Sequence, residues 1–281
     1  MIDTVLFGAG QAGSMAARLL AGNYRPLCFA DNNPERWGKT LCGLPILPPK
    51  DSLDKDPSCV CLCVVDDERA SQMERQVREM GFDGKILRLD ALHTFDVRAA
   101  ALRLLAGELN DRNIPGDAAE LGVYRGGFAA LINSAFPRRT LRLFDTFTGF
   151  PSEDVQMERE MGLAHIKAED FLDASVELVR ERMPFPETVK FYKGRFPESF
   201  SLCPDTDFAF VSIDADLYAP TAAALPLFWK RLNQGGIIMV HDYNSAQFPG
   251  AGRAVREFCR KNALYVTPLC DLHGSCVLVK P

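Results

Sequence analysis

The sequence has no excess of positive charge. Its 281 residues include 32 Lys and Arg against 37 Asp and Glu, a net charge of −5. Without a broad positive field, binding to nucleic acid or to an anionic membrane is not expected. The chain also lacks any apolar run near the ~18 residues that a membrane span needs. Its first residues lack the basic stretch and apolar stretch of a secretory leader. We therefore expect a cytoplasmic protein whose partners are small molecules.

The nine cysteines show no spacing that is typical of a disulfide framework or a metal site. Three of them, Cys59, Cys61 and Cys63, alternate within an apolar run and would share one face of a β-strand. This arrangement favours buried thiols, and it indicates a reducing compartment.

The length of the chain favours two domains, and the alternation of strand-like and helical stretches starts twice. The predicted fold class is α/β, with two tandem doubly wound Rossmann-like domains. An Ala- and Leu-rich helical run, 94–110, is ended by Pro115-Gly116. We place the boundary near residue 93, which gives a small module at 1–93 and a larger domain at 94–281.

The first module begins with a glycine-rich turn between a strand and a helix. Gly8, Gly10 and Gly13 form the G-x-G-x-x-G pattern, and Asp31 ends the second predicted strand. In this context the glycines allow a close approach to phosphate, and the acid reaches a ribose hydroxyl. NAD or a nucleotide-sugar is the expected ligand. The predicted elements are strands at 4–7, 26–30 and 59–65 and helices at 14–21 and 68–80.

The same glycines have a second interpretation, because a strand–helix turn also needs glycine for packing in modules that bind nothing. The opening of the chain, with the Asp-Asn-Asn-Pro stretch that starts at Asp31, resembles small Rossmann-like modules fused to sugar-modifying and polysaccharide-biosynthesis enzymes. No Tyr-x-x-x-Lys follows, and about 90 residues leave no substrate domain for a dehydrogenase. Both interpretations therefore remain open.

A second glycine turn opens the larger domain. The predicted strand 117–123 leads through Glu120, Gly122, Tyr124 and Gly126 into a predicted helix at 128–135. Glycine lets the backbone approach a ligand at such a turn. The spacing resembles the Glu/Asp-x-Gly-x-x-x-Gly opening of class I methyltransferases. That resemblance implies that these residues surround the methionine part of S-adenosylmethionine.

An acidic residue ends the next predicted strand. Asp145 follows the strand 140–144 and lies 23 residues after Gly122. A carboxylate at the tip of the second strand can accept hydrogen bonds from the ribose hydroxyls of an adenosine group. The alternative is an ordinary surface Asp at a strand end.

Two buried-looking strands end in clusters of titratable residues. One apolar run ends in Asp214 and Asp216. The next, 236–240, ends in His241 and Asp242. Because neighbouring parallel strands present their carboxyl ends at one edge of a sheet, we expect these side chains to converge beside the cofactor.

Carboxylates crowded in one cleft repel one another unless a cation neutralises them. Oxygen ligands favour Mg²⁺ or Ca²⁺, whereas an imidazole also suits Mn²⁺, Zn²⁺ or Fe²⁺. Three roles are open for His241. It could contact the substrate or hydrogen-bond a metal ligand, it could itself be a metal ligand, or it could be a structural residue at a strand end.

Four motifs together resemble the macrocin O-methyltransferase family, which includes sugar methyltransferases of macrolide and aminocoumarin pathways. The similarity spans roughly residues 95–281 and implies S-adenosylmethionine, Mg²⁺ and a class I methyltransferase fold. It also implies that Asp214 and Asp242 are metal ligands and that Asp216 is the general base. His241 departs from the family, which has Asp-Asp-Tyr where this chain has His-Asp-Tyr. The motifs lie at 120–126, 144–151, 213–218 and 241–243.

The sequence therefore predicts an S-adenosylmethionine- and metal-dependent O-methyltransferase that acts on a hydroxyl of a sugar or glycosylated small molecule. We expect a diol, since two vicinal hydroxyls could chelate the metal. A catechol-type O-methyltransferase and a non-catalytic nucleotide-binding or scaffold protein are the alternatives, and a homo-oligomer is left open. The long segment 151–186, with His165, is either a lid or a surface excursion. A final antiparallel hairpin is expected at 263–266 and 274–279.

Overall fold

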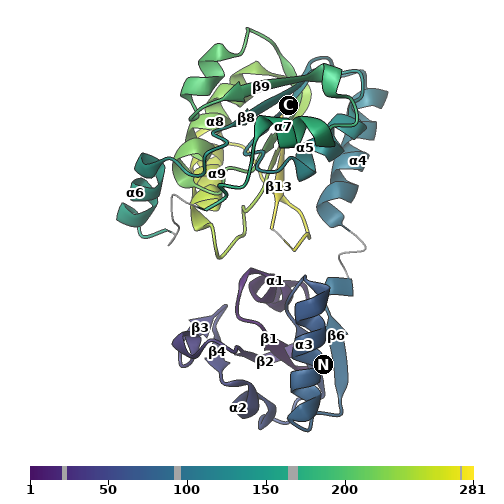
Figure 1. Cartoon of the computed structure of the whole chain (residues 1–281), viewed down its shortest axis with the longest axis vertical. Coiled ribbons are helices and arrows are strands. Elements are labelled where there is room, and N and C mark those ends of the chain that lie inside the picture. The colour runs from purple at the N-terminus through teal and green to yellow at the C-terminus, as the bar shows by residue number, and fades with distance from the viewer. Residues whose placement is uncertain (21–23, 92–95, 164–169, 273) are drawn as a thin grey trace. The chain divides into compact units, whose positions relative to one another are not determined.

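The computed structural model describes residues 1–20, 24–91, 96–163, 170–272 and 274–281. The chain divides into two compact units, Met1–Val97 and Arg98–Pro281. The predicted boundary near residue 93 and His165 both lie outside the described residues. Figure 1 shows each unit as a β-sheet with helices packed against it.

The amino-terminal unit is built on a six-stranded sheet of order β3-β4-β2-β1-β5-β6. All pairs in it are parallel except the pair of β3 with β4. The strand order reverses between β1 and β5, which is where open α/β sheets place ligands. The strands are β1 (Ile2–Phe7), β2 (Tyr24–Ala30), β3 (Thr40–Leu41), β4 (Leu44–Leu47), β5 (Cys59–Leu62) and β6 (Lys85–Arg88). The helices are α1 (Gln11–Leu19), η1 (Pro34–Arg36), α2 (Pro49–Leu53) and α3 (Asp67–Glu79).

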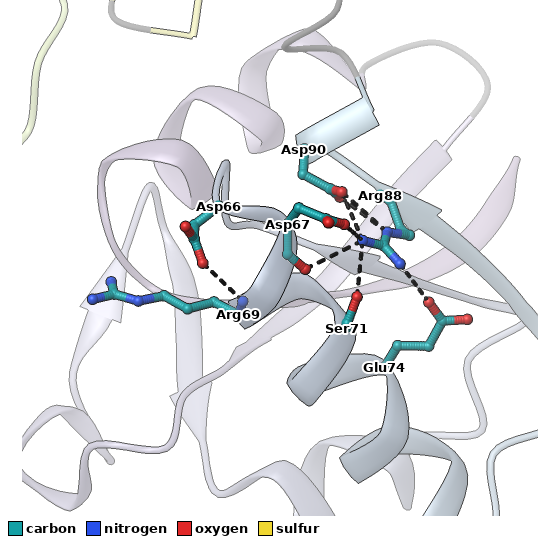
Figure 2. A network of polar contacts seen from close by, with 7 residues as sticks. All are labelled: Asp66, Asp67, Arg69, Ser71, Glu74, Arg88 and Asp90. Atoms are coloured by element: carbon teal, nitrogen blue, oxygen red, sulfur yellow. Dashed lines mark hydrogen bonds and ion pairs between the residues drawn. The ribbon is translucent and has the colours of Figure 1, made fainter.

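A network of polar contacts fastens α3 to the end of β6 (Figure 2). The guanidinium of Arg88 lies 2.7 Å from a carboxylate oxygen of Asp67, 2.7 Å from one of Asp90 and 3.1 Å from one of Glu74. The Asp66 side chain accepts the backbone N–H of Arg69 at 2.8 Å and so caps α3. The acids at this end of the sheet are thus occupied by contacts inside the unit.

The carboxy-terminal unit contains a seven-stranded sheet of order β12-β13-β11-β10-β7-β8-β9. β13 is antiparallel to both β11 and β12, and the other neighbours are parallel. The order reverses between β7 and β10. The strands are β7 (Asp117–Leu121), β8 (Leu141–Asp145), β9 (Val189–Lys193), β10 (Phe208–Ile213), β11 (Leu232–Val240), β12 (Thr267–Pro268) and β13 (Cys276–Val279).

Helices cover both faces of this sheet, because its central strands are apolar on both sides. Every residue of β10 is buried. One core joins the sheet to α8 and α9, and the other joins it to α4, α5 and α7 (Figure 1). The helices are α4 (Val97–Asp111), α5 (Gly127–Ala135), α6 (Ser152–Glu160), α7 (Val176–Arg182), η3 (Pro186–Thr188), η4 (Glu198–Leu202), α8 (Tyr218–Arg231) and α9 (Pro249–Lys261).

The α/β class is confirmed, while several predicted boundaries were displaced. The predicted strand 59–65 ends at Leu62, and the hairpin pairs Thr267 with Val277 and Pro268 with Cys276. Cys59, Cys61 and Cys63 are buried, and all nine cysteines are free thiols. Over the ranges given above, none of the helices is long and apolar enough to cross a membrane.

Candidate functional site

Four strands end at one edge of the carboxy-terminal sheet, around the point where its order reverses. Backbone hydrogen bonds extend the pairing past the strand ends. The Asp214 N–H donates to the carbonyl of Leu121 at 2.8 Å, and the His241 N–H donates to the carbonyl of Ile213 at 2.8 Å. The residues after β7, β10 and β11 are therefore held side by side.

This alignment brings four predicted side chains together. Ligand atoms of Asp214, Asp216, His241 and Asp242 all lie within 4.8 Å of one another. The Nδ1 atom of His241 is 2.8 Å from Asp214 Oδ1 and 2.7 Å from Asp242 Oδ2. The expectation that these residues converge agrees with the geometry, and we call the four residues the acid cluster.

Charges within the acid cluster depend strongly on one another. Burial and the neighbouring carboxylates of Asp214 and Asp242 raise the pKa of Asp216 well above its ordinary value. Burial acts in the same direction on Asp214, but His241 and Arg98 outweigh it and hold the pKa of Asp214 below its usual range. For His241, burial alone would lower the pKa, yet its carboxylate neighbours raise it to about 10. Asp216 is therefore short of neighbouring positive charge, whereas His241 and Arg98 stabilise the charge of Asp214.

Two members of the acid cluster have a costly backbone conformation. Asp216 has φ of 57° and Asp242 has φ of 58°, in the left-handed region that residues other than glycine seldom adopt. Such conformations cost on the order of 1–3 kcal/mol and are concentrated at functional sites. The strand ends are thus shaped to aim these two side chains.

The donor set fits a hard divalent cation. Three carboxylates and one imidazole offer ligand atoms within 4.8 Å of one another, and the nearby cation Arg98 pairs with Asp214. Oxygen ligands of this kind suit Mg²⁺ or Ca²⁺, and an imidazole widens the choice to Mn²⁺. Asp214, Asp242 and His241 are the residues that could hold such an ion.

The glycine turn after β7 is explained first by packing. Gly122 has φ of +82°, and a Cβ atom there would lie 1.9 Å from the carbonyl oxygen of Asp214. Gly126 has φ of +79°, and its Cβ would lie 2.9 Å from the Val179 side chain. The sequence predicted that these glycines make room for a ligand, but the contacts show that they make room for neighbouring protein atoms. Gly122 lets β7 and the acid cluster approach each other.

Asp145 lies beside this turn and already accepts three hydrogen bonds. Its Oδ2 accepts the N–H groups of Val123 at 2.6 Å and Tyr124 at 2.9 Å. Its Oδ1 accepts the N–H of Phe147 at 2.7 Å. A carboxylate has about four acceptor positions, so it retains capacity for a hydroxyl. Asp145 both shapes the turn and can still receive a ribose.

Glu120 is buried at the end of β7, with 1% of its surface exposed. Among the residues that the structure describes, its Oε2 is one of five buried side-chain atoms without a hydrogen-bond partner. Burial raises the pKa of Glu120 well above its ordinary value, and Arg98 partly opposes this. A buried carboxyl oxygen without a hydrogen-bond partner fits a site that receives a cationic group.

The residues predicted in the amino-terminal unit surround its own turn. A Cβ at Gly8 would meet the carbonyl of Cys63 at 2.9 Å, and one at Gly13 would meet the carbonyl of Gly8 at 2.0 Å. Gly10 differs, because its nearest neighbour would be an Arg36 nitrogen at 3.9 Å. The carboxylate of Asp31 accepts the Ala9 N–H at 2.8 Å. Packing therefore explains two of the three glycines.

Comparison with known proteins assigns the chain to a family. The sequence profile described as Macrocin-O-methyltransferase (TylF) matches residues 63–280, which is more than half of the chain. This chain belongs to the macrocin O-methyltransferase family. The family membership that the four motifs indicated is therefore confirmed.

Two curated relatives of this macrocin O-methyltransferase family member are named as O-methyltransferases. Mycinamicin III 3''-O-methyltransferase of Micromonospora griseorubida is 31% identical over 157 residues, which cover 52% of this chain and 61% of the relative. Demethyldecarbamoylnovobiocin O-methyltransferase of Streptomyces niveus is 28% identical over 158 residues, 52% of this chain and 60% of the relative. The chain thus spans about 60% of the length of these relatives.

Solved structures share the fold. The O-methyltransferase NovP is 26% identical with a TM-score of 0.53, over 65% of this chain and 79% of that one. A calicheamicin methyltransferase is 21% identical with a TM-score of 0.54, over 75% of this chain and 90% of that one. The second likeness concerns the fold alone.

Sequence reasoning missed two buried charged residues beside the acid cluster. Arg98, in the first turn of α4, lies 3.0 Å from Asp214 Oδ2. The sequence feature that could have indicated Arg98 is a cation at the start of an Ala-rich helix, where the helix dipole disfavours positive charge. Glu158 of α6 accepts the backbone N–H of Tyr218, where α8 begins. The charged composition of α6 gave no sign that Glu158 is buried.

The segment 151–186 is fastened at two places. Val155 of α6 is buried in a small apolar cluster with Leu217, the residue after Asp216. Farther along, the Tyr124 hydroxyl donates to Asp173 at 2.5 Å. The segment thus contacts both the glycine turn and the acid cluster's flank, and whether it also closes as a lid stays a prediction.

Proposed function

We propose that this chain is an S-adenosylmethionine-dependent O-methyltransferase that methylates a hydroxyl of a sugar or glycosylated small molecule with the help of a divalent metal, Mg²⁺ first among the candidates. The observation that carries the proposal is the acid cluster beside the glycine turn of a macrocin O-methyltransferase family member. The O-methyltransferase activities in the names of the two relatives support the reaction, and the macrocin O-methyltransferase family supports a sugar as the substrate class.

The residues divide the work. Glu120, Gly122, Tyr124, Gly126 and Asp145 would hold the cofactor, with Glu120 toward its methionine ammonium group and Asp145 toward its ribose. Placing the acceptor oxygen in line with the methyl group supplies much of the catalysis in such a displacement. The glycine turn and the acid cluster are suited to this because Gly122 and Asp214 touch through their backbones.

The proton and the methyl group move to different places. S-adenosylmethionine, when bound, would supply the methyl group, which the acceptor oxygen would take as it loses its own proton. The hydroxyl proton would pass to Asp216, because a cation bound beside it would offset the carboxylates of Asp214 and Asp242 that raise its pKa and would leave it ionised to accept the proton. A bound divalent cation, held by Asp214 and Asp242, would lower the pKa of the hydroxyl. His241 would either complete the ligand set or contact the substrate.

The test is methyl transfer to a panel of diols. We expect turnover with a deoxysugar nucleotide or a glycosylated antibiotic, loss of turnover with a chelator, and recovery with Mg²⁺. Turnover on catechols alone would favour the catechol-type enzyme. Cofactor binding without turnover on any diol would favour a scaffold protein. The matching variants are Asp214→Asn and Asp242→Asn, which should weaken metal binding so that high Mg²⁺ restores part of the activity.

For the amino-terminal unit we propose a Rossmann-like module that binds NAD or a nucleotide-sugar at Gly8, Gly10, Gly13 and Asp31. Its support is the reversal of strand order beside this turn and the absence of a packing contact that would require glycine at position 10 among the described residues. Ligand binding should raise the melting temperature of this unit through linkage. No shift with millimolar ligand would favour a packing or docking role.

A further inference from the structure

Arg98 is the buried cation closest to the acid cluster in the described parts of the chain. Only 8% of its surface is exposed. One terminal nitrogen lies 3.0 Å from Asp214 Oδ2, and the other lies 3.5 Å from the hydroxyl of Ser212. The guanidinium carbon lies 3.6 Å from the centroid of the Phe128 ring.

Keeping Arg98 in this place has a cost. A buried charge is unfavourable unless it is paired, and a cation in the first turn of a helix opposes the helix dipole. In the described residues, its Nε atom has no hydrogen-bond partner. Stacking on Phe128 and the contact with Asp214 offset these costs. Because these costs limit what Arg98 can add to the stability of the fold, its effect on Asp214 is the better explanation for its position.

The two oxygens of Asp214 have different neighbours. Oδ2 accepts from Arg98, while Oδ1 faces Nδ1 of His241 at 2.8 Å. Because the Arg98 fork is fixed by both the ring of Phe128 and Ser212, it fixes the rotation of the Asp214 carboxylate. The oxygen that points into the acid cluster is thus selected from outside the cluster.

We propose that Arg98 is a positioning residue, which holds Asp214 so that Oδ1 alone is presented to a divalent cation. The proposal rests on the proposed function, since it assigns a role toward the metal. Hydrogen-bonded partners of metal ligands orient them, and replacing such partners typically costs about 10–100-fold in metal affinity.

A purely electrostatic role gives the opposite sign. If Arg98 acted only as a positive charge beside the site, its removal would leave the acid cluster more negative, and the cluster would then bind a dication more tightly. The sign of the change in metal affinity therefore separates positioning from charge compensation.

The experiment measures Mn²⁺ binding by the full chain, with free Mn²⁺ followed by electron paramagnetic resonance in the presence of saturating S-adenosylhomocysteine. Arg98→Met should weaken Mn²⁺ binding by about 10–100-fold. Arg98→Lys keeps the charge but not the planar fork, so it should also weaken binding. If the Met variant does not fold, the Lys variant carries the test. The Mg²⁺ concentration for half-maximal turnover should rise by the same factor.

Arg142→Met is a matched control. Arg142 forms an ion pair of 2.7 Å with Asp117, at the start of β7 and thus at the opposite end of the strand from Glu120. Its side chain is 11% exposed and that of Asp117 19%, against 9% for Arg98 and 22% for Asp214. Loss of this pair should lower stability but leave Mn²⁺ affinity unchanged.

Several outcomes would overturn the proposal. If Arg98→Met binds Mn²⁺ as tightly as the parent or more tightly, or if Arg98→Lys has the parental Mn²⁺ affinity, Arg98 acts only through its charge and not by positioning Asp214. An equal loss in Arg142→Met would assign the effect to general destabilisation. A parent that binds no Mn²⁺ would remove both this role and the metal in the proposed function, whereas a parent that binds Mn²⁺ with all variants equal would remove only the role of Arg98.

Discussion

The two units of the chain build the same local structure at the same place in their sheets. In each, a glycine turn follows the first strand and an acid ends or follows the second. Asp31 accepts the N–H of Ala9 at 2.8 Å, and Asp145 accepts the N–H of Val123 at 2.6 Å. Both acids therefore hold the turn in place through hydrogen bonds within the protein, without a ligand. A glycine turn with an acid indicates the fold of such a module more securely than it indicates a nucleotide.

The units differ in what the following strands supply. After β5 and β6, Asp66 caps α3, and Arg88 pairs with Asp90 and its neighbours (Figure 2). After β10 and β11, the acid cluster gathers three carboxylates around His241; Arg98 pairs with Asp214, and the pKa of Asp216 stays well above its ordinary value. Acids that are balanced inside the fold point to stability, whereas acids left short of positive charge point to a ligand.

The sharpest way to break this comparison is to neutralise one acid in each unit. Asp216→Asn should lower turnover by roughly 10²–10⁴-fold, because the hydroxyl proton loses its acceptor. Affinities for metal and S-adenosylhomocysteine should stay near those of the parent. Asp66→Asn should change little, since Asn also caps helices well. Steady-state kinetics with calorimetry measure both variants.

Either of two results would remove the contrast between these acids. One is an Asp216→Asn enzyme that turns over at the parental rate. The other is an Asp216→Asn enzyme that loses metal affinity in proportion to turnover, which would make Asp216 a ligand and not the base.

The acidic residues at the strand ends were predictable from the sequence, because each directly follows an apolar run that is typical of a buried strand. Apolar runs that end in acids located Asp214, Asp216 and Asp242, since parallel strands bring their carboxyl ends to one edge. Arg98 was not found, because it lies 116 positions before Asp214 in the sequence and reaches the site only through helix packing. The first hairpin strand was displaced from 263–266 to Thr267–Pro268, because a two-residue strand at the edge of the sheet is too short for an alternating apolar pattern.

The glycines offer a second contrast, in stability. Gly122→Ala should destabilise the carboxy-terminal unit by about 2–4 kcal/mol, because its φ of +82° and the Asp214 carbonyl 1.9 Å from a Cβ both resist a side chain. Gly10→Ala should cost under about 1 kcal/mol, since a Cβ there meets only the end of Arg36. Denaturant unfolding measures both changes.

The two tryptophans of the chain, Trp37 and Trp229, fall in different units, so their fluorescence assigns each transition. Single Trp→Phe backgrounds give the cleanest traces. Equal destabilisation by Gly122→Ala and Gly10→Ala would contradict the packing argument. So would a Gly122→Ala effect that appears only in the transition reported by Trp37.

The strand-end acids give a third contrast, in cofactor binding. Asp145→Ala should weaken S-adenosylhomocysteine binding by roughly 1.5–3 kcal/mol, the value of a charge-assisted hydrogen bond. Asp31→Ala should leave this affinity unchanged. Calorimetry gives the affinities, and Trp229 unfolding shows whether the Asp145 variant keeps its turn. Unchanged affinity in a stable Asp145→Ala protein would remove Asp145 from the cofactor site.

The smallest expected effect concerns the residue in which this chain departs from its family. The Nδ1 atom of His241 lies within 2.8 Å of carboxylate oxygens of both Asp214 and Asp242, so His241 is close enough to these residues to bind the same metal ion. His241→Asp replaces an imidazole by a carboxylate, which Mg²⁺ prefers. If His241 is a ligand, Mg²⁺ affinity should rise by on the order of tenfold, within the range that ligand charge tunes, and the preference for Mn²⁺ over Mg²⁺ should fall. If His241 only contacts the substrate, metal affinity should stay unchanged while KM for the acceptor rises. Calorimetric titrations with both metals, together with acceptor kinetics, distinguish these outcomes. Weaker Mg²⁺ binding would contradict both roles, because it would mean that the cluster needs the positive charge of His241 more than it needs another oxygen.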